Sequence, residues 1–131
     1  MRTLYLLCFL TLLTACMHAQ PQYTYADGSA NRYLITASSL QYIPVKPEES
    51  STGMYSGGDP ANVTLTKEQF ENLKQLLENG IAATGNHIPD RIKMSGAITR
   101  TAKSDTITII LKPGAPEQVA LESALKQLLK K

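Results

Sequence analysis

The chain has 131 residues, of which 43% are hydrophobic and 18% are charged, a length and composition typical of a single small domain. Thirteen Lys and Arg against eleven Asp and Glu leave a net charge of +2, too small for the clustered basic surface that binds nucleic acid. The two Cys cannot form a disulfide-dense scaffold, and two Phe, six Tyr and no Trp are few aromatic side chains for stacking bases.

The first residues have the pattern of a secretory signal peptide. Met1 and Arg2 form a short positive segment, and residues 4–13 are almost wholly apolar. A membrane-spanning helix needs about 20 apolar residues, so this run is too short to cross a bilayer. In an ordinary secreted protein, such a signal peptide would be cleaved near Ala19.

Residues 13–16, Leu-Thr-Ala-Cys, resemble the lipobox of bacterial lipoproteins, in which Leu, a small residue and Ala or Gly precede a Cys. The resemblance implies a signal peptide over residues 1–15 and a lipidated Cys16, which carries a diacylglycerol thioether and an N-acyl chain such as palmitate. Two or more chains give a stable membrane anchor. Met17, in place of Asp, implies the outer membrane under the enterobacterial sorting rule. We therefore expect a lipid-anchored protein of the bacterial cell envelope.

A flexible tether is predicted after the anchor. Residues 18–31 are polar, with a Pro and an Asp27-Gly28 turn signal, and show no sustained apolar periodicity. The expected boundaries are therefore a lipidated Cys and tether over residues 16–31 and one domain over residues 32–131. The alternative is that Tyr23 and Tyr25 begin a first strand.

One strand is predicted over residues 32–45, where apolar residues alternate and change phase around Ser38-Ser39, which suggests a bulge. Pro44 and Pro47 end it. The next segment, residues 48–62, is rich in Ser and Gly and opposes regular structure.

Two amphipathic helices are predicted by apolar residues at helical spacing. Thr66 and Gln69 match a capping box at the start of the first helix, which ends at Asn79-Gly80 or at Gly85. The second helix covers residues 116–129. The expected buried stripes are Phe70, Leu73, Leu77 and Ile81 in the first helix, and Leu121, Leu125 and Leu128 in the second.

Residues 91–112 are expected to form a hairpin that turns over residues 102–105, because β-branched residues alternate with polar ones. The predicted fold is α+β, a mostly antiparallel sheet of three or four strands with both helices on one face. The expected element order is strand, loop, helix, two strands, helix.

Catalytic motifs are missing from the sequence, which holds no phosphate-binding Gly-rich motif, no His-Glu-x-x-His and no Cys pair of zinc-site spacing. His87 is the only His after the tether, and a Ser with His87 as base and Asp90 or Asp105 as orienting group is conceivable, but no nucleophile motif marks the Ser. We therefore expect no enzyme, no cofactor and no metal.

The loop over residues 50–60 is the favoured functional segment. Irregular loops on a rigid scaffold often carry function, and two of its side chains are large and apolar. The candidate partner-binding residues are Gly53, Met54, Tyr55, Ser56, Gly57, Gly58 and Asp59.

The order of elements resembles the emfourin-like domains that inhibit metallopeptidases. The matching parts are Ser56-Gly57-Gly58, the helix from Thr66, the strand over residues 106–111 and the helix ending at Leu128-Leu129, while residues 48–59 form an insertion. In size and anchoring the chain also resembles the potempins, lipoproteins that block secreted proteases of the same bacterium. The resemblance implies an inhibitor of a secreted or periplasmic protease, with its loop in the active-site cleft. Met54 or Tyr55 would fill a serine protease's specificity pocket, and Asp59 or a backbone carbonyl would face a metallopeptidase's metal.

Two alternatives remain open from the sequence. One is an envelope-complex adaptor or immunity-type lipoprotein that docks through a helix face or a sheet edge, with residues 32–45 as the docking edge. The other is a carrier of small apolar ligands between sheet and helices.

Overall fold

The structure is a computed structural model that describes residues 19–130. The expected signal peptide and the lipidation site Cys16 lie outside the described residues. Of the helices described within this range, none is long and apolar enough to span a bilayer.

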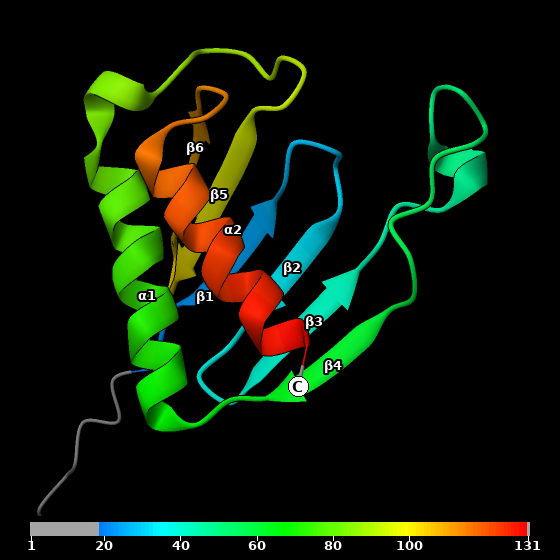
Figure 1. Ribbon diagram of the computed structural model, residues 1–131. Coiled ribbons are helices and arrows are strands. Elements are labelled where there is room, and N and C mark those ends of the chain that lie inside the picture. Colours follow the sequence, from blue (N-terminus) through cyan, green and yellow to red (C-terminus); the bar gives the residue numbers. More distant parts are fainter. Residues whose placement is uncertain (1–18, 131) are drawn as a thin grey trace, which may run out of the picture.

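The described residues form six strands, two α-helices and two short 3₁₀ turns (Figure 1). The strands are β1 (Gln22–Ala26), β2 (Arg32–Ile35), β3 (Ser39–Ile43), β4 (Ala61–Thr64), β5 (Gly96–Ala102) and β6 (Asp105–Leu111). The helices are α1 (Lys67–Ala82) and α2 (Pro116–Leu129), and the 3₁₀ turns are η1 (Pro47–Glu49) and η2 (Thr84–Asn86).

All strand pairs are antiparallel, and the strands lie in the order β4-β3-β2-β1-β5-β6. Both helices pack side by side on one face of this sheet (Figure 1). The α+β class therefore stands, but the prediction of three or four strands is wrong, because the sheet has six. Three segments account for the difference.

The first is β1, which lies within the predicted tether but forms the centre of the sheet, between β2 and β5. Tyr23 and Tyr25 are 2% and 0% exposed. Their hydroxyls donate to the carboxylates of Glu78 on α1, at 2.6 Å, and Glu122 on α2, at 2.7 Å. These two hydrogen bonds satisfy the buried hydroxyls, so a polar-looking segment becomes a core strand. The tether prediction is thus wrong for β1, and the alternative that Tyr23 and Tyr25 begin a strand is confirmed.

The second is the segment over residues 32–45, which is two strands rather than one. Between β2 and β3 the chain reverses at residues 36–38, where the Thr36 amide donates to the Ser39 carbonyl at 2.9 Å and the two hydroxyls lie 2.8 Å apart. The phase change at Ser38-Ser39 therefore marks a hairpin turn, not a bulge. Because β2 and β3 are interior strands, residues 32–45 do not form the docking edge that the sequence suggested.

The third is β4, which has four residues and too short a pattern to be recognised in the sequence. The hairpin of β5 and β6 is confirmed, but β5 begins at Gly96, not at residue 91. Met94, with a φ of 68°, cannot continue an extended strand at that point.

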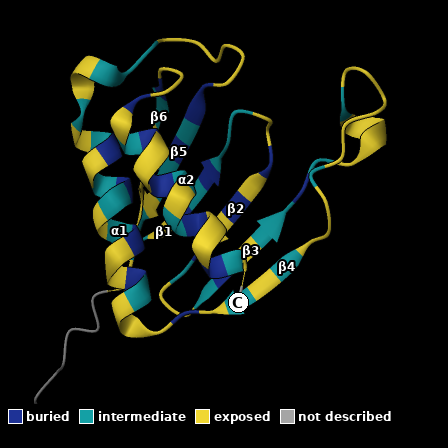
Figure 2. Ribbon diagram, in the orientation of Figure 1, coloured by how far each residue is buried: buried dark blue, intermediate teal, exposed yellow. Residues whose placement is uncertain are grey.

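Both helices are found where the sequence predicts them, but α1 ends at Ala82, between the two predicted ends at Asn79-Gly80 and at Gly85. Thr66 and Gln69 form the expected capping box, with reciprocal hydrogen bonds of 3.1 and 2.9 Å. The expected stripes face the sheet and are buried except for Ile81, which is half-buried. Figure 2 shows the buried residues on the inner faces of the helices and exposed residues on the outer faces.

Candidate functional site

The connection between β3 and β4 projects beyond the end of the sheet, and we call residues 44–60 the arm (Figure 1). It contains η1 and a turn in which the Gly53 amide donates to the Ser50 carbonyl at 3.1 Å. The Ser50 hydroxyl donates to the Pro47 carbonyl at 2.9 Å and accepts from the Tyr55 amide at 3.3 Å. The tip of the arm is therefore folded upon itself, although its composition predicted only an irregular loop.

The base of the arm is fastened to the sheet by Asn31, which is 4% exposed and immediately precedes β2. Its side-chain carbonyl accepts from the Val45 amide at 3.0 Å, and its side-chain amide donates to the Tyr55 hydroxyl at 3.0 Å. The same amide group donates to the Asp27 carboxylate at 2.9 Å. Asn31 thus joins the β1–β2 turn to the outgoing segment of the arm at Val45 and to its returning segment at Tyr55.

A second contact closes the base between Gly57 and the sheet. The Gly57 amide donates to the Val45 carbonyl at 2.9 Å, and the Gly57 carbonyl accepts from the Tyr42 hydroxyl at 2.7 Å. A Cβ at position 57 would lie 2.1 Å from the Asn31 oxygen, so only glycine fits there. Burial raises the pKa of Tyr42, so its hydroxyl stays protonated as the donor.

The predicted binding residues have different roles in this arrangement. Met54 is 85% exposed at the tip, and Ser56, Gly58 and Asp59 are also exposed. Tyr55 is 39% exposed and turns its hydroxyl back to Asn31, so it holds the arm as well as contributing surface. The structure therefore separates a free tip from a fixed base.

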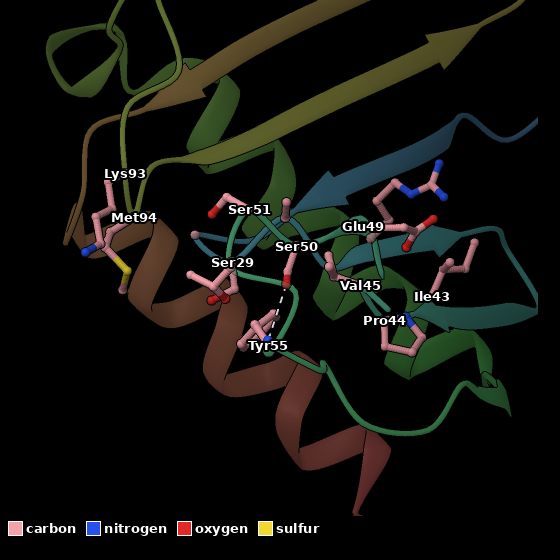
Figure 3. A pocket seen from close by; sticks show the side chains of 14 residues that line it. Ser29, Ile43, Pro44, Val45, Glu49, Ser50, Ser51, Tyr55, Lys93 and Met94 are labelled. Atoms are coloured by element: carbon pink, nitrogen blue, oxygen red, sulfur yellow. Dashed lines mark hydrogen bonds between the residues drawn. The ribbon is translucent and has the colours of Figure 1, made fainter. Parts of the chain in front are cut away.

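A groove of about 680 Å³ runs between the arm and the loop that precedes β5. Figure 3 shows Val45, Ser50 and Tyr55 of the arm on one side and Lys93 and Met94 across the groove. The lining of the groove combines apolar side chains with three charged residues, Arg32, Glu49 and Lys93. Such a surface fits an extended peptide segment better than a single small apolar molecule.

The loop before β5 is held rigidly against the β1–β2 turn. The Arg91 guanidinium donates to the carbonyls of Asp27, at 2.8 Å, and Ser95, at 2.9 Å. A Cβ on Gly28 would lie 2.8 Å from the Met94 Cα, so the two backbones approach closely. Met94 has a left-handed backbone, which costs a non-glycine residue about 1–2 kcal/mol, and its side chain is 54% exposed. Strain of this kind at the wall of a groove is typical of functional sites.

The sequence did not predict that the loop before β5 would line the groove, nor that Asn31 would hydrogen-bond to the arm. The hairpin predicted over residues 91–112 includes Ile92 and Met94, but both are more than half exposed in an irregular loop. The one sequence signal for this region was the Asp27-Gly28 turn. The Asp27 carboxylate also accepts hydrogen bonds from the backbone amides of Ser29 and Asn31.

The residues considered for catalysis are not brought together as a site. The His87 ring lies 2.9 Å from the Gly80 carbonyl, and Asp90 and Asp105 are exposed. Within residues 19–130, no group of three or more His, Cys, Asp or Glu is placed to hold a metal ion.

Comparisons of this chain with protein-family models, with curated proteins and with solved structures gave no significant match.

Proposed function

We propose that this protein is a binding module that inhibits a peptidase, and that the tip of the arm enters the peptidase's active-site cleft. The observation that carries the proposal is the contrast between the two ends of the arm. Met54 is 85% exposed at the tip, while Asn31, Tyr42 and Gly57 fix the base by hydrogen bonds. A preorganised loop loses less conformational entropy on binding, which favours tight occupancy of a cleft.

Met54 is the side chain that we assign to the partner's pocket. An exposed Met is unbranched and adapts to pockets of irregular shape. Tyr55 adds apolar surface beside it, but its hydroxyl holds the arm, so a Tyr55→Ala variant would confuse loss of contact with loss of arm structure. Met54 makes the cleaner test.

The module acts at the cell envelope in this proposal, anchored through lipid at Cys16. The anchor would hold the inhibitor where secreted or periplasmic peptidases pass, which suits protection of the cell from its own enzymes.

The test uses the full chain in non-ionic detergent, added to the secreted peptidases of the cells that produce it, with labelled casein as substrate. We expect inhibition by the parent chain and inhibition at least about tenfold weaker for Met54→Ala, because central apolar anchors dominate interface energies. Val119→Ala is the matched control, since Val119 is 55% exposed on α2 and does not line the groove. Equal inhibition by all three chains, or none by any, contradicts the proposal.

A second candidate function, docking onto an envelope complex, is favoured by the face of the sheet opposite the helices. The register places on this open face Gln22, Thr24, Ala26, Arg32, Leu34, Ser39, Gln41, Ile43, Asn62, Thr64, Ala97, Thr99, Thr101, Thr106, Thr108 and Ile110. Arg32 is the single charged residue among these sixteen. Depletion of charge is typical of interface cores.

The two candidates are distinguished by where a substitution abolishes binding. Leu34→Arg places a charge at the centre of the open face, where Leu34 is 37% exposed. It should abolish capture of an envelope partner if the face docks, and leave peptidase inhibition unchanged if the arm is the inhibitor.

A further inference from the structure

A second cavity, of about 370 Å³, lies behind the arm, between α2 and the β1–β2 turn. Tyr33, Tyr42 and Tyr55 contribute to its lining, together with Gln118 and Glu122 of α2. The ring centroids of Tyr33 and Tyr42 lie 5.0 Å apart with a tilt of 42°, so they form one aromatic wall. The cavity has the size of a site for a small molecule or for one side chain.

Gln118 supplies a buried acceptor that no group within residues 19–130 satisfies. Its side chain is 5% exposed, and its Nε2 donates to the Met94 carbonyl at 3.0 Å and to Glu122 Oε1 at 3.1 Å. Those two acceptors fix the orientation of the amide, because a flipped amide would point its oxygen at a carbonyl and a carboxylate. Gln118 Oε1 is left without a hydrogen-bond partner among the described residues. Buried polar groups usually have a hydrogen-bond partner, so this unsatisfied acceptor marks the part of α2 that borders the cavity.

The charges around the cavity favour a cation. Two acidic residues, Asp27 and Glu122, line it, against one basic residue, the exposed Lys126. Glu122 accepts the hydrogen bonds from Tyr25 and from Gln118 at one oxygen, Oε1. Burial raises the pKa of Tyr33, and the negative charges of Asp27 and Glu122 raise it further, as expected at a site of negative potential.

We propose that this cavity binds a monovalent organic cation, an alkylammonium or alkylguanidinium group, which donates to Glu122 beside the Gln118 side chain and lies against the tyrosine rings. Aromatic faces attract cations within about 6 Å, and a carboxylate bonded to an N–H donor of a cation gives a strong hydrogen bond. The site is separate from the arm's tip and stands whether or not the arm inhibits a peptidase.

Two sources supply this chemistry, a free amine or a Lys or Arg side chain of a bound peptide. Tyr55 and Met94 line both this cavity and the groove of Figure 3. A peptide lying in the groove can therefore place a side chain in the cavity.

The test is a titration of the full chain, in non-ionic detergent, with n-butylammonium chloride and with n-butylguanidinium chloride. Amide NMR signals report binding, and n-pentanol is the neutral control. We expect saturable shifts at the Gln118 side-chain amide and at Glu122 with at least one cation and none with the alcohol. A response to all three probes, or to none, overturns the proposal.

Two variants locate the site. Glu122→Gln keeps an acceptor for the Tyr25 hydroxyl but removes the charge, and should weaken cation binding about tenfold. Lys126→Ala removes a competing positive charge from an exposed position and should tighten binding, a gain that misfolding cannot produce. Unchanged affinity in both variants contradicts the assignment.

The source is identified by a capped pentapeptide with one lysine between glycines. Tighter binding than n-butylammonium assigns the cavity to a peptide side chain, because the groove then adds contacts. Equal or weaker binding assigns it to a free amine.

Discussion

Asn31 connects three separate segments, namely the β1–β2 turn, the start of the arm at Val45 and the returning part of the arm at Tyr55. Asn31→Ala removes three side-chain hydrogen bonds at a residue that is 4% exposed, and it leaves the Val45 amide without an acceptor. We expect a loss of about 2–4 kcal/mol in the free energy of unfolding, with faster amide exchange throughout the arm. Urea unfolding and hydrogen exchange measure the two effects.

The matched control is Asn62→Ala, an exposed Asn on β4, which should change stability by about 0.5 kcal/mol or less. Unaltered exchange in the arm of Asn31→Ala would show that this residue does not organise the arm.

Such single residues are where sequence reasoning was weakest. Asn31 and Asp27 both suggest a turn, and nothing in their spacing indicates a partner 24 residues further along, at Tyr55. Gly57 was predicted as a partner-binding residue, and the structure shows that its lack of a Cβ lets Asn31 approach the backbone. Contacts of this kind depend on the folded register of the sheet, which the local pattern does not contain.

The helices could be predicted because their signals are local. α2 has the expected bounds, and α1 begins at the expected capping box. Strands depend on pairing with distant segments, so β1 was mistaken for a tether and β2 with β3 for one strand. Of the candidate site, the arm's location was predicted, but its groove was not, because the opposite wall comes from the loop before β5.

The capping box of α1 gives a prediction at this scale. Thr66 is exposed, and its hydroxyl accepts from the Gln69 amide at 3.1 Å. Thr66→Ala should lower the free energy of unfolding by about 1 kcal/mol, because one amide at the helix start loses its acceptor. Thermal and urea unfolding check this value. Ser123→Ala, an exposed mid-helix position of α2, is the control and should be neutral or slightly stabilising. An equal loss in both variants would assign the effect to something other than the cap.

A row of tyrosines lies on the face of the sheet that the helices cover. Tyr25, Tyr33 and Tyr42 are direct cross-strand neighbours, and adjacent ring centroids lie 5.9 and 5.0 Å apart. Tyr23 lies on the same face and donates to Glu78, which also pairs with Arg100 at 2.8 Å. The two hydrogen bonds to Glu78 and Glu122 tie the central strand to both helices, so the buried hydroxyls couple the sheet to the helical layer.

This row makes the fold sensitive to alkaline pH. Burial, followed by the hydrogen bond to a carboxylate, raises the pKa of Tyr23 and of Tyr25 well above 10.0, and burial raises that of Tyr33. Unfolded tyrosines lose their protons above about pH 10, whereas the folded ones keep theirs, so the unfolded state gains stability as pH rises. The stability that these tyrosines contribute is fully present below pH 10 and is lost as the pH rises toward their pKa in the folded state.

Each of the three tyrosines lowers stability by about 1.4 kcal/mol per pH unit in this window, or about 4 kcal/mol together. A small domain has about 5–15 kcal/mol in total, so we expect cooperative unfolding within about one to four units above pH 10. Tyrosinate absorbance and far-ultraviolet circular dichroism should change together in one alkaline transition. Tyr25→Phe removes one coupled proton and should make that transition shallower. Tyrosines that ionise in separate steps, with the helix signal unchanged, would mean that the row does not couple the sheet to the helices.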